Sequence, residues 1–425
     1  MNRVLSLGNS AQRQRVGPSR RLLGLHVSSD CRTVAGALVQ TTGQGLHAGV
    51  ELLAADTNEV APQVVQRYQN LRAGRLERPG DVGLLAAGLA EVQARLVEQL
   101  LAQGHLTAEE VTALGVHDSG LWHIVPGGRS GYVGLCDAAG LAETTGLCVI
   151  DAFPARDLAC GGQGGPVTAL PLWMILRDRQ RTRALLDLGR TTRLTYLPPT
   201  KVGSAGVRSF DVGPGTLLLD ELAGRFSGGR YTHDPGGRLA VQGRRIPDLI
   251  EHWLEDPYFR RPPPRWHPLG VRPDDELDQT VEMAVRAGWS IRDLLCTATH
   301  FIAESIQRAL ANHMPTKPAV EEVLIVGGGQ QNGLLLRELS ARLSGKVLTR
   351  YSERGTPDIV LEAWAVAVLG SLHVDQVPAN PEAITGTNAP RVLGRLTPGS
   401  PAAWRRLLQV LTEQPHTKTA MRDAV

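Results

Sequence analysis

The amino-acid sequence predicts two α/β domains of similar construction with a cleft between them. The chain has 425 residues, which is too long for one ordinary hydrophobic core and suits two. Its periodic segments form two successive blocks, and each block begins with a β-meander and ends in alternating helices and strands. Hydrophobic residues make up 42% of the chain, and its 47 glycines and 27 prolines are typical of a turn-rich enzyme.

The first block holds five predicted strands and two predicted helices. Apolar runs of strand length predict strands at 22–27, 33–40, 47–55, 113–116 and 147–151. Apolar residues at helical spacing predict an amphipathic helix over 82–103, and a shorter helix is predicted over 138–145.

The second block repeats this pattern. Strands are predicted at 184–189, 193–197, 207–212, 323–326 and 347–350, and helices at 216–226, 246–255, 290–312 and 359–373. The domain boundary should lie near 170–183. We therefore expect a disordered basic tail over 1–21, an N-terminal α/β domain over 22–175, a C-terminal α/β domain over 176–375 and an extension over 376–425.

Charge and composition argue against several classes of protein. The 45 basic and 42 acidic residues leave a net charge of +3, which is too balanced to indicate nucleic-acid binding. No apolar run is long enough for a signal peptide or a membrane span, so we expect a cytoplasmic protein without a membrane partner. The 5 cysteines form no CxxC pair and the 12 histidines no HExxH motif, which favours free thiols in a reducing compartment over disulfides or zinc.

Two hairpin turns could hold phosphate. After the first strand, Ser28 and Ser29 could donate hydrogen bonds and Asp30 could bind a metal ion, although an ordinary polar turn would look the same. In the corresponding turn of the second block, Gly189 permits tight passage of the backbone. Arg190 beside it could face phosphate or lie in solvent, as most arginines do.

Two glycine-rich segments follow strands of the second block. Asp211 ends one strand before the turn Gly213-Pro214-Gly215, which opens a helix whose free N–H groups could bind an anion; Thr216 could instead be only the N-cap. Gly327-Gly328-Gly329 follow a buried strand and would let the backbone approach a flat or charged ligand. Asn332 could contact that ligand or cap the next helix.

Carboxylates and a glycine-rich loop lie where a strand of the first block ends. Asp151 and Asp157 flank Arg156, and the loop Gly161-Gly162-Gln163-Gly164 follows. A carboxylate at such a strand exit can act as a general base. The alternative is a salt bridge of Arg156 beside a flexible loop.

Other polar residues could line a sugar pocket. His117 with Asp118, and Trp122 with His123, follow a different buried strand of the first block. Aromatic rings stack on sugar faces, but histidines with a structural role are a serious alternative. Glu362, in a predicted helix, is either part of a site or an ordinary surface residue.

Taken in chain order, these segments resemble the anhydro-N-acetylmuramic acid kinases. The matching runs are 24–25, 115–123, 143–146, 151–153, 156–157, 161–164, 194–199, 211–215, 257–259, 262–264, 327–332, 357–358 and 362–363. The resemblance spans roughly 22–372. It implies two RNase H-like domains of the actin/hexokinase/Hsp70 type around a nucleotide cleft, with the nucleotide held by the C-terminal domain.

The resemblance also implies an activity. Members of this family use ATP and Mg²⁺ to open the 1,6-anhydro ring of the amino sugar with water and to phosphorylate O6, in cell-wall recycling. Asp157 would activate the water, and the Gly213 turn and the 327–329 loop would hold the nucleotide. The expected partner is a small amino-sugar substrate, and a homodimer stays open.

The chain departs from the family pattern at positions that contact phosphate in it. Arg32 stands where the family has an aspartate, and Arg190 where it has a glycine. In one interpretation the chain is a kinase in which Arg32, Arg190 and Arg193 contact phosphate and Asp30 replaces the lost acid. In another it is a kinase-shaped protein that binds a sugar or nucleotide without turnover. A third is a kinase for another amino sugar.

Overall fold

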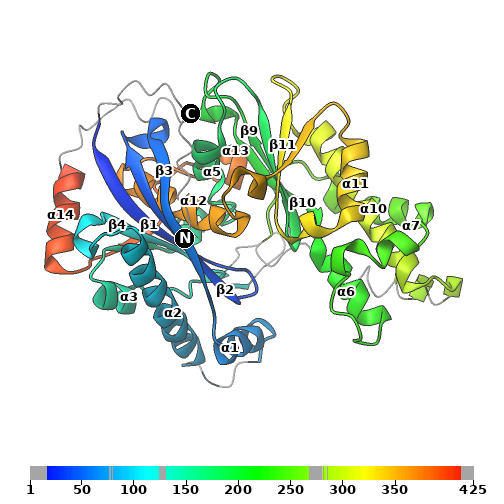
Figure 1. The fold of residues 1–425 in the computed structure, drawn as a ribbon, viewed down its shortest axis with the longest axis horizontal. Coiled ribbons are helices and arrows are strands. Elements are labelled where there is room, and N and C mark those ends of the chain that lie inside the picture. The colour runs from blue at the N-terminus through cyan, green and yellow to red at the C-terminus, as the bar shows by residue number, and fades with distance from the viewer. Residues whose placement is uncertain are drawn as a thin grey trace. The chain divides into compact units, whose positions relative to one another are not determined.

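The chain divides into two units, each built around one main β-sheet (Figure 1). The computed structural model describes residues 17–75, 78, 80–123, 131–267, 280, 282–284 and 286–412. The first unit comprises the chain up to Leu176 and again from Ile359 onward, and the second comprises Arg177–Asp358. No helix among the described residues is both long and apolar enough to cross a membrane.

The sheet of the first unit has the strand order β13-β7-β4-β1-β2-β3. An antiparallel meander is formed by β1 (Ser19–Val27), β2 (Thr33–Thr42) and β3 (Gly49–Glu59). Beside β1 lie β4 (Ala113–His117) and β7 (Val149–Asp151), both parallel to it. The last strand, β13 (Arg395–Thr397), pairs antiparallel with β7.

The alternation of side chains along β1 sends them into two cores. Leu23 and Leu25 pack with α2 (Asp81–Gln103), beside α1 (Pro62–Arg72) and α3 (Ala138–Thr145). On the other face, Leu22 packs with α12 (Leu361–Val374). The remaining elements of this unit are β5 (Leu121–His123), β6 (Gly131–Val133), α4 (Phe153–Ala159), α5 (Ala169–Leu176), α13 (Glu382–Thr385) and α14 (Pro401–Thr412).

The second unit repeats the topology of the first five strands. Its sheet has the order β10-β9-β8-β11-β12, with an antiparallel meander of β8 (Arg183–Leu188), β9 (Thr191–Leu197) and β10 (Arg208–Pro214). Parallel to β8 follow β11 (Glu322–Val326) and β12 (Val347–Arg350). The predicted fold class, two RNase H-like α/β domains, is confirmed by this repeat.

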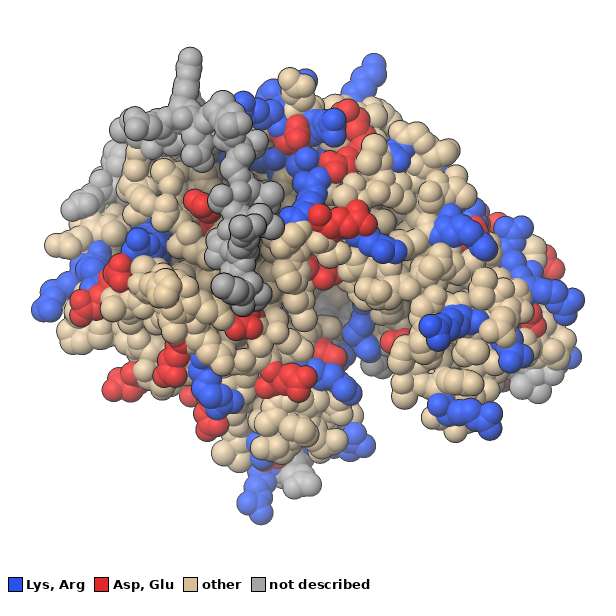
Figure 2. Space-filling model, in the orientation of Figure 1, with Lys and Arg blue, Asp and Glu red and all other residues tan. Residues whose placement is uncertain are grey.

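Helices cover the second sheet and complete its core. They are α6 (Thr216–Phe226), α7 (Pro247–Leu254), α8 (Pro257–Arg260), α10 (Ile291–His313) and α11 (Gly333–Arg342). The long helix α10 contacts α6, α7 and α11. On the face shown in Figure 2, acidic and basic side chains are interspersed, as the small net charge of +3 leads one to expect.

The ends of the chain differ from the sequence prediction. The expected second domain ran to residue 375, but α12 packs on β1, β2 and β4, so the chain returns to the first unit. The expected tail ran to residue 21, but Arg20 lies in β1 and is buried, with Nη2 2.6 Å from Asp375 Oδ1. Its charge is therefore matched inside the first unit. Residues 1–16 of the expected tail lie outside the described residues.

Glycine at two positions of the sheet allows α12 to lie directly on the strands. A Cβ atom at Gly24 of β1 would overlap the backbone of α12 at Ala363 and Ala367. At Gly115 of β4 it would lie 2.8 Å from the carbonyl oxygen of Val366. The helix α12 cannot move away from β1 and β4 without disturbing the packed core around them.

We expect Gly24→Ala to destabilise the protein by about 3 kcal/mol, because the added methyl group must push α12 away from β1. Urea unfolding followed by circular dichroism measures this. The matched control is Gly83→Ala in α2, where nothing lies within 4 Å of the new Cβ and helix propensity favours alanine by about 1 kcal/mol. Equal unfolding midpoints for Gly24→Ala and the parent protein would contradict the close approach.

Candidate functional site

Asp157 is the buried centre of the first candidate site. It lies on the short helix α4 and is 0% exposed. Its Oδ1 accepts hydrogen bonds from Asn380 Nδ2 and Thr385 Oγ1, each at 2.7 Å, and its Oδ2 accepts one from the N–H of Gly164 at 2.7 Å. The carboxylate thus joins the glycine-rich loop to a segment more than 220 residues further along the chain.

The environment of Asp157 makes its carboxylate more basic than usual. Burial raises the pKa of Asp157, while the hydrogen bonds from Asn380, Thr385 and Gly164 act in the opposite direction. No cation among the described residues pairs with it. Since two carboxylate oxygens offer about four acceptor positions, Oδ2 can accept one more hydrogen bond. Such a fixed and basic carboxylate is suited to general-base chemistry.

The glycine-rich loop packs against both Asp157 and Trp122. A Cβ at Gly162 would overlap the carboxylate of Asp157, and a Cβ at Gly164, which has φ +88°, would lie 2.7 Å from Trp122 Cη2. Trp122 in turn packs on the ring of Tyr132, with 4.6 Å between ring centroids. The structure therefore brings Asp157, Trp122 and this loop together, as a sugar pocket requires.

The other predicted substrate residues are placed as follows. Gly161 and Arg156 are exposed, and Gln163 is half-buried and donates its backbone N–H to the carbonyl of Thr385 at 2.9 Å. His117 lies at the end of β4 with its ring centroid 5.7 Å from that of His26. Glu362 is half-buried in the first turn of α12.

Asp118, which follows β4, is a second buried carboxylate near Trp122. It is 3% exposed, and its Oδ1 accepts a hydrogen bond from the N–H of Gly120 at 2.7 Å and lies 3.5 Å from Tyr132 Oη. Burial raises the pKa of Asp118 to about 6, against the lowering effect of backbone hydrogen bonds from Leu135 and Gly120. Two carboxylates without a cationic partner among the described residues thus lie on either side of the Trp122 contact.

The turn between β1 and β2 uses its polar groups to close itself. Ser28 Oγ donates to Asp30 Oδ1 at 2.7 Å and accepts from the N–H of Thr33 at 3.0 Å. The N–H of Arg32 points at the same two acceptors, 3.1 Å from Ser28 Oγ and 3.2 Å from Asp30 Oδ1. Arg32 Nε lies 3.6 Å from Asp30 Oδ2, and Ser29 is exposed. Of the predicted phosphate and metal ligands here, Ser28 and Asp30 are engaged within the turn.

Three loops of the second unit meet at their glycines. A Cβ at Gly327 would lie 2.8 Å from the backbone nitrogen of Gly189, and one at Gly215 would overlap the carbonyl oxygen of Gly189. At Gly329, a Cβ would lie 2.8 Å from the carbonyl oxygen of Leu188. The structure thus gathers the segments that the sequence analysis predicted to bind nucleotide. Gly328 is exposed, and nothing lies within 4 Å of where its Cβ would be.

The sequence analysis predicted free amides at the start of α6, and this prediction is wrong. The N–H of Gly215 donates to the carbonyl of Arg190 at 2.8 Å, and the N–H of Thr216 donates to that of Gly189 at 2.9 Å. These bonds tie the Gly213-Pro214-Gly215 turn to the hairpin, so the helix start offers its first amides to protein and not to an anion. The side chain of Arg190 itself is exposed.

Asp211 and Asn332 have clear structural partners. Asp211 is 0% exposed, and its Oδ1 lies 2.9 Å from Arg193 Nε, while its Oδ2 accepts from the N–H of His267 at 2.9 Å. Asn332 Oδ1 accepts from the N–H of Leu335 at 3.0 Å and caps α11, which confirms the capping alternative. Both residues hold the loops in place.

Gln330, which the sequence analysis did not single out, adds a buried polar side chain to the glycine loops. Its Nε2 donates to Asp358 Oδ2 at 2.7 Å, and the N–H of Gly327 donates to the same oxygen at 2.9 Å. Because the carboxylate fixes which end of the amide is the donor, Oε1 faces the other way. That oxygen is buried and has no hydrogen-bond partner among the described residues. Gly328 with its exposed backbone and this unpartnered oxygen are the groups of the loop that a ligand could contact.

The described residues offer few ligands for a metal ion. Among the residues the structure describes, no group of three or more His, Cys, Asp or Glu side chains gathers as a metal site would require. A Mg²⁺ ion bound with a nucleotide takes most of its ligands from phosphate and water, so one carboxylate such as Asp30 would suffice.

Comparison with known proteins assigns the family. The fold and these loops define a two-unit α/β protein of the RNase H-like class. The family model described as anhydro-N-acetylmuramic acid kinase matches residues 23–399, and the chain belongs to this family. A relative of that name from Acaryochloris marina is 32% identical over 382 residues, covering 88% of this chain and 99% of the relative. One from Bordetella petrii is 34% identical over 389 residues, covering 88% and 98%.

Solved structures are more distant. Component A of the (R)-2-hydroxyglutaryl-CoA dehydratase of Acidaminococcus fermentans has a TM-score of 0.41 and 12% identity, covering 82% of this chain and 96% of its own. A ROK family glucokinase from Streptomyces griseus has a TM-score of 0.37 and 11% identity, covering 82% and 98%.

The raised pKa of Asp118 predicts a pH-dependent cost to stability. A folded-state pKa of about 6, above the usual aspartate value, means that the folded protein binds the proton more tightly than the unfolded chain. Stability attributable to Asp118 is then present at low pH and is lost as the pH rises through about 6. We expect Asp118→Asn to gain up to about 3 kcal/mol over the parent between pH 4 and pH 7.5.

Urea unfolding at both pH values measures this difference. The control is Glu91→Gln on the exposed surface of α2, which removes one carboxylate that is in solvent. Parallel stability profiles for Asp118→Asn and the parent protein would show that Asp118 is not held in its neutral form.

Proposed function

We propose that this protein is an ATP-dependent sugar kinase acting on anhydro-N-acetylmuramic acid, as the names of its relatives indicate for them. The observation that carries the proposal is Asp157, a buried and unpaired carboxylate held by three hydrogen bonds against a glycine-rich loop and Trp122. The reaction is hydrolytic opening of the 1,6-anhydro ring with phosphorylation at O6. The setting is cell-wall recycling in the cytoplasm.

Asp157 activates the water that attacks the sugar. Its free acceptor position on Oδ2 takes a hydrogen bond from water, and burial raises its pKa so that it accepts the proton readily. Asn380 and Thr385 hold Oδ1, so that the carboxylate cannot rotate away. The proton passes from water to Asp157 Oδ2 as the oxygen of water bonds to C1 and the bond from C1 to O6 breaks.

The sugar lies against Trp122 and the loop of Gly161, Gly162 and Gln163. The indole face supplies an apolar platform, and the glycines let the ring approach the loop backbone. Muramic acid carries a carboxylate on its lactyl group, and the exposed guanidinium of Arg156, beside Asp157 on α4, can pair with it. Asp118 accepts a hydrogen bond from a sugar hydroxyl.

The glycine loops of the second unit hold the nucleotide. Gly328 presents its exposed backbone to it, and Gln330 Oε1 accepts a hydrogen bond from it. Bound ATP would supply the phosphoryl group for O6 of the sugar, with ADP as the leaving group, and Asp30 would be the candidate protein ligand of a Mg²⁺ ion that offsets phosphate charge. Arg190, which is exposed, can turn toward phosphate, whereas Arg32 Nε lies 3.6 Å from Asp30 Oδ2.

We expect Asp157→Asn to lower kcat by at least about 10³, because a general base contributes roughly 10²–10⁴ and the amide cannot accept the proton. Incubation with Mg-ATP and anhydro-N-acetylmuramic acid, followed by mass spectrometry of the 6-phosphate, measures the effect. Asp137→Asn, which alters only the cap of α3, is the control.

The result also separates the two interpretations of the altered phosphate loops. Equal product from Asp157→Asn and the parent protein would exclude Asp157 as the base. Absence of product in the parent, with sugar binding still measurable by calorimetry, would favour a protein that binds its ligand without turnover.

Gly328→Ala should weaken nucleotide binding about tenfold without loss of stability, because the new Cβ meets no protein atom but stands where the backbone faces a ligand. Titration with a fluorescent ATP analogue and a urea unfolding curve test both halves of this expectation. Gly224→Ala in α6, with one atom at 3.9 Å from its Cβ, is the control. Unchanged affinity in Gly328→Ala would place the nucleotide elsewhere.

A further inference from the structure

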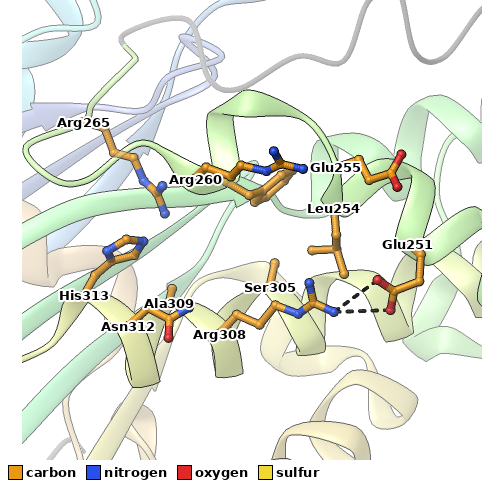
Figure 3. Close-up of a pocket in the computed structure, with 11 residues that line it drawn as sticks. Glu251, Leu254, Glu255, Arg260, Arg265, Ser305, Arg308, Ala309, Asn312 and His313 are labelled. Atoms are coloured by element: carbon orange, nitrogen blue, oxygen red, sulfur yellow. Dashed lines mark hydrogen bonds and ion pairs between the residues drawn. The ribbon is translucent and has the colours of Figure 1, made fainter.

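A pocket of about 340 Å³ opens within the second unit (Figure 3). Its walls come from the end of α7, from α8 with the segment after it, and from the last turns of α10. Pockets of this size hold small metabolites. Neither the family nor the catalytic groups described above assign anything to it.

Charged side chains line the pocket on two sides. Figure 3 shows Arg308 turned toward Glu251 on one side, and Arg260 and Arg265 on the other. Arg308 is already neutralised, with Nη2 3.3 Å from Glu251 Oε1 and 2.6 Å from Glu304 Oε1. Arg260, which is exposed, makes no hydrogen bond or ion pair with the described residues. The three arginines are thus balanced by Glu251, Glu255 and Glu304, and the positive charge of the pocket is local to the end that holds Arg265.

Arg265 at the inner end of the pocket is buried without a carboxylate. It is 2% exposed and donates to the carbonyl oxygens of Asp211, Tyr258 and Arg261 at 2.8, 3.0 and 2.7 Å. These bonds satisfy N–H groups but do not cancel the charge, so desolvation remains costly. The carboxylate of Asp211 is bonded to Arg193 and to the backbone of His267 instead.

The pKa shifts around Arg265 agree with a local positive charge at this end of the pocket. Burial lowers the pKa of the Arg265 guanidinium. Burial and then the charge of Arg265 lower the pKa of His313, the neighbouring side chain in the pocket. An anion in the pocket would offset both effects, since it would supply the missing opposite charge.

We propose that this pocket binds a small organic oxyanion, a phosphate ester or a carboxylate, between Arg260 and Arg265. Figure 3 shows the two guanidinium groups on the same side of the pocket, with His313 and Arg308 on the other. Arg260 can pair with either kind of oxyanion through two parallel hydrogen bonds, while Arg265, whose Nε and Nη1 are bonded to carbonyl oxygens, can donate from Nη2. The apolar remainder of the ligand contacts Phe259 and Ala309.

The pocket also touches the support of the glycine loops. Phe259 lines it, and a Cβ at Gly213 would lie 2.8 Å from Phe259 Cε1. Arg265 Nε holds the carbonyl of Asp211 on the same strand, β10. An anion bound here therefore contacts the residues that fix the end of β10.

Isothermal titration of the full chain with inorganic phosphate tests the proposal, with a non-hydrolysable ATP analogue present so that the nucleotide site does not contribute. We expect saturable binding that Arg260→Gln weakens about tenfold, the usual effect of losing one charge-assisted hydrogen-bonding partner. Arg261→Gln is the matched control. It removes the same charge at the next residue, whose side chain does not line the pocket.

A second variant removes the site without changing its charge. Asn312 is exposed at the rim on α10, so Asn312→Trp should fold normally and block the entrance. Loss of phosphate binding in this variant supports the proposal. Binding that survives in Asn312→Trp, or that Arg260→Gln and Arg261→Gln weaken equally, would overturn it.

Acetate in place of phosphate distinguishes the two ligand classes. Tighter binding of phosphate indicates a phosphate ester, and equal or tighter binding of acetate indicates a carboxylate. Failure of both anions to bind refutes the pocket as an oxyanion site. None of these readouts depends on catalysis, so kinase activity and this site can fail separately.

Discussion

The direct packing of α12 on the backbone of β1 and β4 is the constraint on which the first candidate site depends. Gly24 and Gly115 allow it, because any side chain there would enter the backbone of the helix. The helix α12 brings the chain back to the first sheet. Directly after this helix, Asp375 forms an ion pair with Arg20 of β1. Only then can Asn380 and Thr385 reach Asp157. A backbone contact far from the chemistry thus positions the candidate base.

Buried aspartates in this protein fall into two groups, and the difference indicates their roles. Asp151 is held by Arg395 at 3.1 and 2.6 Å, and Asp211 by Arg193 at 2.9 Å, so each charge is matched inside the fold. Asp118 and Asp157 have no cationic partner among the described residues, and burial raises the pKa of both. Stability would favour replacing such groups, so Asp118 and Asp157 are candidates for a functional role.

Local patterns predicted the elements of this fold well, and distant contacts could not be predicted. The helix at 216–226, the helix at 138–145 and the strand at 347–350 have the predicted bounds, because periodicity and turn residues are local. Arg20 was assigned to a tail since its partner, Asp375, lies 355 residues away. Asn380 and Thr385 were placed in an extension for the same reason. Asp157 was predicted as the base from the sequence, but Asn380 and Thr385, which bond to it, were not.

The two predicted phosphate hairpins differ in which backbone amides are already hydrogen-bonded, and this argues for different kinds of phosphate contact. In the first, Ser28 and Asp30 accept hydrogen bonds from the amides of Arg32 and Thr33, so these two amides are not available to an anion. In the second, the carbonyls of Gly189 and Arg190 accept hydrogen bonds from the first amides of α6, while no protein atom lies near the Cβ position of Gly328. In the second unit the exposed backbone is therefore at Gly328, and we expect the side chain of Arg190 to supply further phosphate contacts. Guanidinium groups can do so, since they pair with phosphate as amides do and add charge.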